Sequence, residues 1–250
     1  MYDMNNPFTL NNKTILVTGA SSGIGRVTAI LCSQMGARVV ATGRNYDRLS
    51  ETFASLAEDG HVKLQADLTD SESRASLVKA LPALDGIVYC AGIGQRKLAV
   101  ELAQQDIQDV MDANFTSIVL LQAELMANKR INKGASIVFL SSRTADIPTI
   151  ANSLYSASKG ALKSYSKCLS LELAPRKIRV NCICPAMVWT PLVLQGNVSE
   201  EDLREQEKRY PLKRYGQPQD IANLAVFLLS DASGWMTGSC IDITGGAINI

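Results

Sequence analysis

The chain has 250 residues, 46% of them hydrophobic, and its 25 basic and 24 acidic residues give a formal net charge of +1 at pH 7. This length and apolar content favour one large α/β domain with a sizeable core. Balanced charge without a basic tract argues against nucleic acid or an anionic membrane as a partner. No apolar run reaches transmembrane length, and the first residues lack a signal-peptide pattern, so we expect a cytoplasmic protein.

Short apolar β-type runs alternate with longer helical patterns along the chain. The predicted strands are Thr14–Val17, Arg38–Thr42, Val62–Gln65, Gly86–Tyr89, Ala135–Leu140, Arg179–Ile183 and Ser239–Ile243. The predicted helices lie near 24–35, 45–57, 71–81, 102–130, 154–174, 199–208 and 218–230. Continuously apolar strands, such as 136–140, are typical of a parallel sheet buried on both faces. We therefore predict one domain over 1–250, a doubly wound seven-stranded parallel sheet flanked by helices.

The first strand leads directly into Thr18-Gly-Ala-Ser-Ser-Gly-Ile-Gly25, and a helix follows. Glycines at 19, 23 and 25 permit a tight turn and let phosphates approach the backbone, while the helix N-terminus favours an anion. The alternative is a tight turn without a ligand. The loop also matches the G-x-S-x-G hydrolase elbow, but the only histidine, His61, lies far upstream of the position that a triad needs. A P-loop would require Lys-Ser/Thr where Arg26 and Val27 stand.

The six cysteines, at positions 32, 90, 168, 182, 184 and 240, are mostly in apolar stretches. We expect small buried hydrophobes in a reducing compartment. Cys182 and Cys184 form a C-x-C pair that would share one face of a strand, but no second ligand pair is evident. We therefore predict no metal site.

Tyr155 and Lys159 are four residues apart on the predicted helix 154–174, so they share one helical face. Free tyrosine titrates near pH ~10, too high for acid–base work at neutral pH. A neighbouring ammonium lowers the pKa of a phenol by favouring the phenolate. The same spacing also occurs on solvated helices, so the pair gains weight only from the residues around it.

Together with the glycine loop and Ser142, thirteen residues before Tyr155, this pair resembles the short-chain dehydrogenase/reductase family. The pattern is most similar to the 3-oxoacyl-carrier-protein reductases and covers nearly the whole chain. Further family landmarks are Asp67-Leu68, Asn114, Arg179-Val-Asn181, Thr237-Gly238 and the run from Pro211 to Ala222. The resemblance implies a Rossmann fold, a nicotinamide cofactor, and interconversion of a carbonyl and a secondary alcohol.

The resemblance also implies roles for particular residues. Tyr155 would exchange a proton with the substrate oxygen, Lys159 would lower the pKa of Tyr155 and bind the nicotinamide ribose, and Ser142 would hold that oxygen. Asn114 would hold a water that relays protons to Lys159. The implied cofactor-binding residues are Gly19, Ser21, Ser22, Gly23, Ile24, Gly25, Arg44, Asp67, Leu68, Ala91, Gly92, Tyr155, Lys159, Pro185, Val188 and Thr190.

Two departures from the family pattern affect the backbone near the cofactor. Tyr89-Cys90-Ala91-Gly92 replaces Asn-Asn-Ala-Gly, so the contacts of both asparagines must be made otherwise. Pro185-Ala186 replaces Pro-Gly, which matters if the loop needs the backbone freedom of glycine.

A third departure concerns cofactor choice. An acidic residue after the second strand selects NAD by binding the ribose 2′-hydroxyl, but here Gly43 and Arg44 follow Thr42. A guanidinium can clamp a 2′-phosphate, so we predict NADP(H) over NAD(H). Arg44 as a solvated residue at a helix start is the alternative, and Ser22 replaces the basic residue of some NADP-using relatives.

The sequence defines the substrate poorly. Residues 186–210 are predicted to form a loop and helix over the substrate. Its apolar residues Trp189, Leu192, Val193 and Leu194 suit a hydrophobic or acyl-like molecule, or a neighbouring subunit. A set of basic residues could dock an acidic acyl carrier protein or be ordinary surface: Lys129, Arg130, Lys133 and Arg176.

Two further expectations concern the class of protein and its assembly. The resemblance implies a homotetramer, or a dimer, formed through the helices near 102–130 and 154–174 and the C-terminal strand. A non-catalytic dinucleotide-binding or redox-sensing protein is the alternative function. Such a protein would need the glycine loop but neither Tyr155 nor Lys159.

Overall fold

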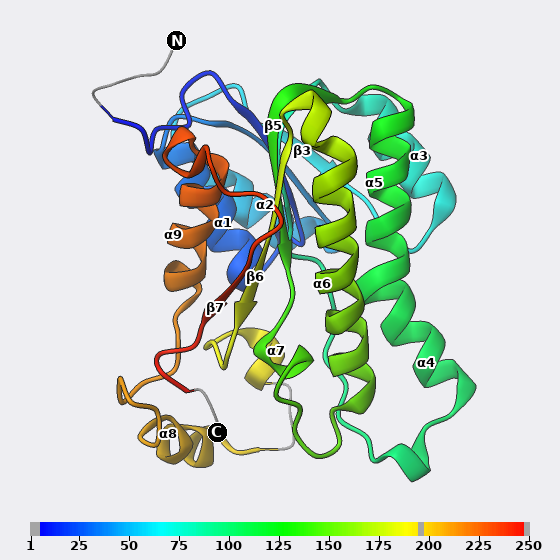
Figure 1. The fold of residues 1–250 in the computed structure, drawn as a ribbon, viewed down its shortest axis with the longest axis vertical. Helices are drawn as coiled ribbons and strands as arrows, with labels where there is room; N and C mark the ends of the chain where they lie inside the picture. The colour runs from blue at the N-terminus through cyan, green and yellow to red at the C-terminus, as the bar shows by residue number, and fades with distance from the viewer. Residues whose placement is uncertain (1–5, 195–197, 248–250) are drawn as a thin grey trace.

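The computed structural model describes residues 6–194 and 198–247. Its centre is one seven-stranded sheet, parallel throughout, in the order β3-β2-β1-β4-β5-β6-β7 (Figure 1). The strands are β1 (Thr14–Thr18), β2 (Arg38–Gly43), β3 (Val62–Gln65), β4 (Leu84–Tyr89), β5 (Ile131–Leu140), β6 (Arg179–Pro185) and β7 (Cys240–Ile243). The predicted doubly wound fold and all seven strands are confirmed.

Helices cover both faces of the sheet (Figure 1). One face carries α1 (Gly23–Gln34), α2 (Tyr46–Ala54) and α9 (Pro218–Leu229), and the other carries α3 (Ser71–Ala80), α4 (Gln104–Met111), α5 (Ser117–Ala127) and α6 (Ser153–Leu173). Neighbouring strand residues enter opposite cores: Ile87 packs in one cluster and Val88 in the other. This two-sided burial explains the continuously apolar strands. Within the described ranges, no helix is long and apolar enough to cross a membrane.

The helix predicted over 102–130 is interrupted, which the sequence did not reveal. The segment consists of the 3₁₀ turn η1 (Ala99–Glu101), α4, the π-helical turn η2 (Asp112–Thr116) and α5. At the π turn the amide of Ser117 donates to the carbonyl of Asp112, five residues earlier. Apolar periodicity tolerates such a turn, because one extra residue only shifts the buried stripe.

The irregular segment after β6 contains two helices. The short α7 (Pro191–Leu194) was not predicted, and it begins with proline, whose missing amide is tolerated in a first turn. Helix α8 (Glu200–Glu207) was predicted, and the Ser199 side chain caps it by accepting from the amide of Asp202 at 3.1 Å. Residues 195–197 of the predicted covering segment lie outside the described residues.

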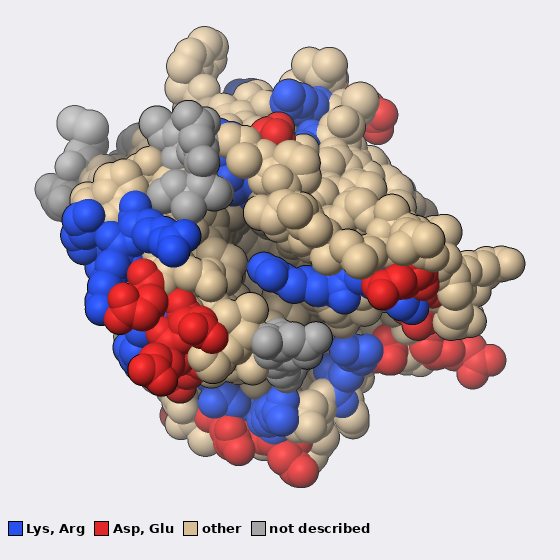
Figure 2. All heavy atoms as spheres, turned by 90° about the horizontal axis from the view of Figure 1, so that it is seen from below, with Lys and Arg blue, Asp and Glu red and all other residues tan. Residues whose placement is uncertain are grey.

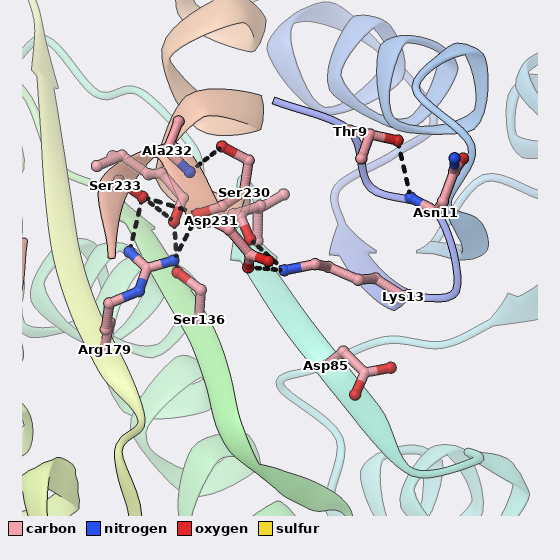
Figure 3. Close-up of polar contacts among 12 residues, drawn as sticks. Thr9, Asn11, Lys13, Asp85, Ser136, Arg179, Ser230, Asp231, Ala232 and Ser233 are labelled. Atoms are coloured by element: carbon pink, nitrogen blue, oxygen red, sulfur yellow. Dashed lines mark hydrogen bonds and ion pairs between the residues drawn. The ribbon is translucent and has the colours of Figure 1, made fainter. Parts of the chain in front are cut away.

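A polar cluster ties the C-terminal end of α9 to the sheet (Figure 3). Ser136 on β5 donates to the carbonyl of Leu228 at 2.6 Å. Arg179, the first residue of β6, donates to the carbonyl of Ser230 at 3.0 Å and to Oγ of Ser233 at 2.8 Å. The last carbonyls of a helix lack intrahelical partners, and a cation near them is favoured. The cluster therefore fixes α9 across the middle of the sheet.

We expect Arg179→Met to lower the free energy of unfolding by about 1–3 kcal/mol, because partly buried hydrogen bonds from a charged group are lost. Chemical denaturation at pH 7 measures the change. Arg38→Met is the matched control, since Arg38 also begins a strand but is exposed and donates to the carbonyl of Gly60. Its effect should stay within about 0.5 kcal/mol. Equal losses in both variants would contradict a special role for the α9 cluster.

Candidate active site

The carboxyl ends of the parallel strands meet at one edge of the sheet, at the bottom of Figure 1. The strand order reverses between β1 and β4, and ligands bind doubly wound sheets outside such a point. A cavity of about 460 Å³ lies at this edge. Figure 2 shows a hollow on this side with Lys and Arg side chains beside it. Eight of the predicted site residues line the cavity: Ile24, Gly92, Ser142, Tyr155, Lys159, Pro185, Val188 and Thr190.

The glycine loop lies between β1 and α1 and closes against the end of β4. Gly19 has a φ of +64°, and a Cβ there would stand 2.8 Å from the amide nitrogen of Ala91. A Cβ on Gly25 would stand 2.3 Å from the carbonyl oxygen of Gly19. Helix α1 begins with no side-chain cap from Ser22 and no acidic residue in its first turn. Its N-terminal dipole therefore suits an anion such as a dinucleotide pyrophosphate.

The remaining predicted cofactor residues follow β2 and β3, beside this loop. Gly43 is buried against Ser21: a Cβ on Gly43 would lie 3.1 Å from Oγ of Ser21. The side chain of Gln65 donates to the carbonyl of Arg44 at 2.8 Å, and the Arg44 side chain is exposed. Partial burial raises the pKa of Asp67, but hydrogen bonds from Thr69 and the charge of Arg44 outweigh it, so the net pKa is lowered. Arg44 and Asp67 thus face the same region of solvent. Leu68 is buried in the core behind them.

The structure distinguishes the two serines at the end of β5, which the sequence could separate only by spacing. The hydroxyl of Ser141 donates to the carbonyl of Lys159 at 2.7 Å and is turned toward α6. Oγ of Ser142 accepts from the amide and hydroxyl of Thr144, at 3.2 and 3.1 Å. The one proton of Ser142 is left to be donated, and a hydrogen bond from Ser142 acts to lower the pKa of Tyr155.

Lys159 is 5% exposed, and its ammonium donates to the carbonyl of Leu140 at 2.8 Å. The ammonium lies 5.7 Å from the centre of the Tyr155 ring. Burial lowers the pKa of Lys159 to about 8, and the nearby thiols of Cys182, Cys90 and Cys184 act in the opposite direction. A Cβ on Gly92 would stand 3.5 Å from this nitrogen, so glycine leaves room beside it.

The pKa of Tyr155 differs from the expectation that Lys159 lowers it. Burial raises the pKa of Tyr155 above its ordinary value, and the hydrogen bond with Ser142 only reduces the shift. Lys159 points its ammonium at the carbonyl of Leu140, not at the phenol oxygen. Tyr155 is therefore a neutral phenol at pH 7, which is the form that donates a proton.

Asn114 sits within the π turn η2 and is fully buried. Its Oδ1 accepts from the amide of Ile93 at 2.7 Å, and its Nδ2 donates to the carbonyl of Ile93 at 3.0 Å and to Ser158 at 3.1 Å. Both amide hydrogens are thus used. The side chain locks the turn after β4 against α6, so a water relay to Lys159 would need the Asn114 backbone.

The departures at residues 89 and 90 are compensated by groups that sequence reasoning missed. The Tyr89 ring stacks on Phe139 at 4.9 Å, and its hydroxyl donates to Gln122 at 2.9 Å. Oγ1 of Thr18 accepts from the amides of Cys90 and Ala91, at 3.1 and 3.3 Å. The only sign of this role in the sequence was Thr18 itself, a polar residue at the end of the buried strand β1.

The alanine at position 186 causes no backbone strain. Ala186 is not among the described non-glycine residues with positive φ. Its amide donates to the carbonyl of Ile243 at 3.1 Å. The position that is usually glycine therefore does not need glycine's freedom here.

The part of the cavity beyond Ser142 and Tyr155 is largely apolar. Leu192 and Val193 of α7 line it as predicted, and Ile147, Leu203 and Tyr210 complete the wall. Trp189 instead packs on Tyr215 at 5.4 Å and donates to Glu207 at 2.8 Å. Arg96, not anticipated from the sequence, lines the opening. Within the described ranges, no group of three His, Cys, Asp or Glu side chains could hold a metal ion.

Because the ammonium of Lys159 is buried, we expect the difference in free energy of unfolding between the wild type and Lys159→Met to depend on pH. The unfolded chain binds the proton with an ordinary pKa near 10.5 and the folded chain with a pKa of about 8, so the unfolded state holds more protons between these values. Wild-type stability relative to Lys159→Met should then rise by about 2 kcal/mol from pH 7 to pH 9.5. Denaturation at both pH values measures this, with the exposed Lys79→Met as control. A constant difference would contradict the lowered pKa.

Known proteins are similar to this chain in both sequence and fold. A family model described as Enoyl-(Acyl carrier protein) reductase matches residues 19–247. A 3-oxoacyl-[acyl-carrier-protein] reductase FabG from Rickettsia felis is 31% identical over 241 residues, covering 96% of this chain and 99% of the relative. The corresponding reductase from Aquifex aeolicus is 30% identical over 244 residues, covering 95% and 98%.

Solved structures agree with these relatives. A short chain dehydrogenase/reductase family protein superposes with a TM-score of 0.85 at 32% identity, covering 96% of this chain and 98% of the other. An actinorhodin polyketide ketoreductase with NADPH superposes with a TM-score of 0.87 at 29% identity, covering 95% and 98%. Similarity of this extent, over the glycine loop and the cavity alike, shows that the chain belongs to the short-chain dehydrogenase/reductase family of NAD(P)-dependent oxidoreductases.

Proposed function

We propose that the protein uses NADP(H) to interconvert a carbonyl and a secondary alcohol, with Tyr155 as the proton-transfer group. The observation that carries this proposal is that Ser142, Tyr155 and the buried Lys159, one helical turn from Tyr155, line the same cavity. The bound nicotinamide would supply or accept the hydride.

The residues around the cavity divide the remaining work. Ser142, whose Oγ accepts from Thr144, would turn its proton to the substrate oxygen and hold that oxygen beside the Tyr155 hydroxyl. Tyr155 gives that oxygen a proton as negative charge develops on it. Lys159, one donor of which is fixed by the carbonyl of Leu140, has further donors for the nicotinamide ribose. Its positive charge near the developing phenolate favours the proton transfer.

The apolar wall formed by Leu192, Val193 and Leu203 supports a hydrophobic or acyl-like substrate. A 3-oxoacyl group on an acyl carrier protein is one candidate, since relatives are named for that reaction. Within one subunit, the basic residues suggested for docking a carrier lie at the opposite edge of the sheet from this cavity. Lys129, Arg130 and Lys133 are at the start of β5, whose ten residues span about 30 Å to the cavity (Figure 1). Arg96 at the opening is better placed.

The preference for NADP(H) rests on Gly43 and Arg44. No carboxylate follows β2 directly to bind a ribose 2′-hydroxyl, and the exposed Arg44 that comes directly after β2 carries a guanidinium of the kind that binds a 2′-phosphate. Asp67, whose pKa is lowered partly by Arg44, faces the same region, so NAD(H) is the alternative cofactor. A sensor that binds the cofactor without turnover remains the second function, and it would leave the Ser142–Tyr155 arrangement unused.

Tyr155→Phe should reduce the turnover of carbonyl substrates by about 10²–10⁴-fold, because the proton donor is lost. NADPH oxidation with a panel of ketones and 3-oxoacyl thioesters measures turnover, and NADPH fluorescence measures cofactor binding. Tyr165→Phe is the matched control: Tyr165 lies on the same helix but packs edge-on against Phe139 in the core, so activity should persist. Undiminished turnover in Tyr155→Phe would refute the mechanism. Cofactor binding without wild-type turnover on any carbonyl would instead support the sensor.

Gly43→Asp should raise KM for NADPH by at least tenfold more than KM for NADH, because a carboxylate repels the 2′-phosphate. Gly43→Ala is the control for the Cβ, which would lie 3.1 Å from Oγ of Ser21 in both variants. Steady-state kinetics with both cofactors distinguish the effect of the added carboxylate from the effect of the added Cβ. Equal losses for NADPH and NADH, or the same selectivity change in both variants, would contradict the preference.

The chain should assemble with copies of itself, as a tetramer or a dimer. Leu171 on α6 is 77% exposed and Trp235 before β7 is 100% exposed, so both regions present apolar side chains to solvent. Sedimentation equilibrium should give the mass of a multimer, reduced by Trp235→Glu. A monomeric wild type at micromolar concentration would contradict this assembly.

A further inference from the structure

Three thiols that the proposed reaction does not use gather on one face of the sheet, beneath α6. Cys182 and Cys184 are two residues apart on β6 and so share a face, and Cys240 on β7 is paired with Cys182 in the strand register. Cys182 is fully buried, whereas Cys240 is partly exposed on β7, the last strand at this edge of the described sheet. Sequence spacing alone could not bring Cys240 to the C-x-C pair.

The thiols differ in pKa, which is lowered for Cys240 and Cys184 and raised for Cys182. The hydrogen bond from Cys182 lowers the pKa of Cys240 to about 6, and Lys167 and Lys163 of α6 lower it further against the effect of burial. The hydrogen bonds to Cys184 and Cys240 raise the pKa of Cys182, which therefore keeps its proton. A partly exposed thiolate thus lies beside a buried thiol. Thiolates, not thiols, react with electrophiles.

The geometry selects one pair among the three. Residues paired in register on neighbouring strands have Cα atoms about 4.8 Å apart, within the range of about 4.4–6.8 Å for disulfides. Cys182 and Cys184 lie about 6.6 Å apart along one strand, close to the upper limit. No metal accounts for the cluster, since no group of three ligating side chains in the described ranges is arranged to hold one.

We propose that Cys240 and Cys182 are a peroxide-sensitive dithiol. The Cys240 thiolate attacks a hydroperoxide and takes one oxygen, which gives a sulfenic acid and, with one proton, releases water or an alcohol. The Cys182 sulfur then attacks the Cys240 sulfur, and the sulfenic oxygen leaves as water with the proton of Cys182. Two thiols are oxidised to one disulfide and one hydroperoxide is reduced.

The test treats the reduced full-length protein with hydrogen peroxide at pH 7, quenches with iodoacetamide, and maps non-reduced peptides by mass spectrometry. We expect a Cys182–Cys240 link, loss of two titratable thiols, and recovery with dithiothreitol. The link should persist in Cys184→Ala, which distinguishes Cys182 from Cys184 as the partner. It should also persist in Cys168→Ser, because Cys168 is exposed on α6 and outside the cluster.

Cys240→Ser should abolish the link, and its fold can be verified by circular dichroism. Three results would overturn the proposal: oxidation of Cys168 ahead of Cys240, oxidation of Cys240 without a link to Cys182, or oxidation of Cys182 that proceeds equally in Cys240→Ser. The measurement on the wild-type protein decides the question even where a variant fails to fold.

Discussion

The candidate site depends on two hydrogen bonds that run in opposite directions between β5 and α6. The ammonium of Lys159 donates to the carbonyl of Leu140, and the hydroxyl of Ser141 donates to the carbonyl of Lys159. Both are buried, where an unpaired group costs more than in water. Together they fix the rotation and height of α6 against the end of the sheet. Tyr155, one turn earlier on α6, is thereby placed beside Ser142.

The buried ammonium of Lys159 is tolerated because polar groups around it partly stabilise its charge. Lys159 has a carbonyl partner and thiols nearby, yet burial still lowers its pKa to about 8. The folded state thus bears an electrostatic cost at the group that the proposed chemistry needs. Buried ionisable residues with strongly shifted pKa values cluster at functional sites, so the burial of Lys159 points to function. Around it, the stacked Tyr89 and the hydroxyl of Thr18 replace polar side chains that the family pattern would supply.

Much of the fold followed from the sequence, because strands buried on both faces are continuously apolar and the glycine loop needs a strand before it and a helix after it. The proposed catalytic pair, Tyr155 and Lys159, was suggested by its four-residue spacing and by the resemblance to a known family. The choice between Ser141 and Ser142 could not be made from the side chains themselves, since both are polar residues at the end of a strand. The two serines differ only in the direction of their side chains. The raised pKa of Tyr155 also could not be predicted. It depends on burial and on where the Lys159 ammonium points, and neither is encoded in spacing.

The π turn that carries Asn114 makes the cavity sensitive to helical phase. One residue corresponds to about 100° of rotation in an α-helix. A deletion within 112–116 that restored regular winding would rotate α4 by that angle relative to α5. Asp106 on α4 holds the cavity wall through Gln95 and Lys97, at 2.8 and 2.7 Å, and it would swing away. The wall at this side of the cavity can therefore change through a shift of a single residue in a helix, without substitution of any residue that lines it.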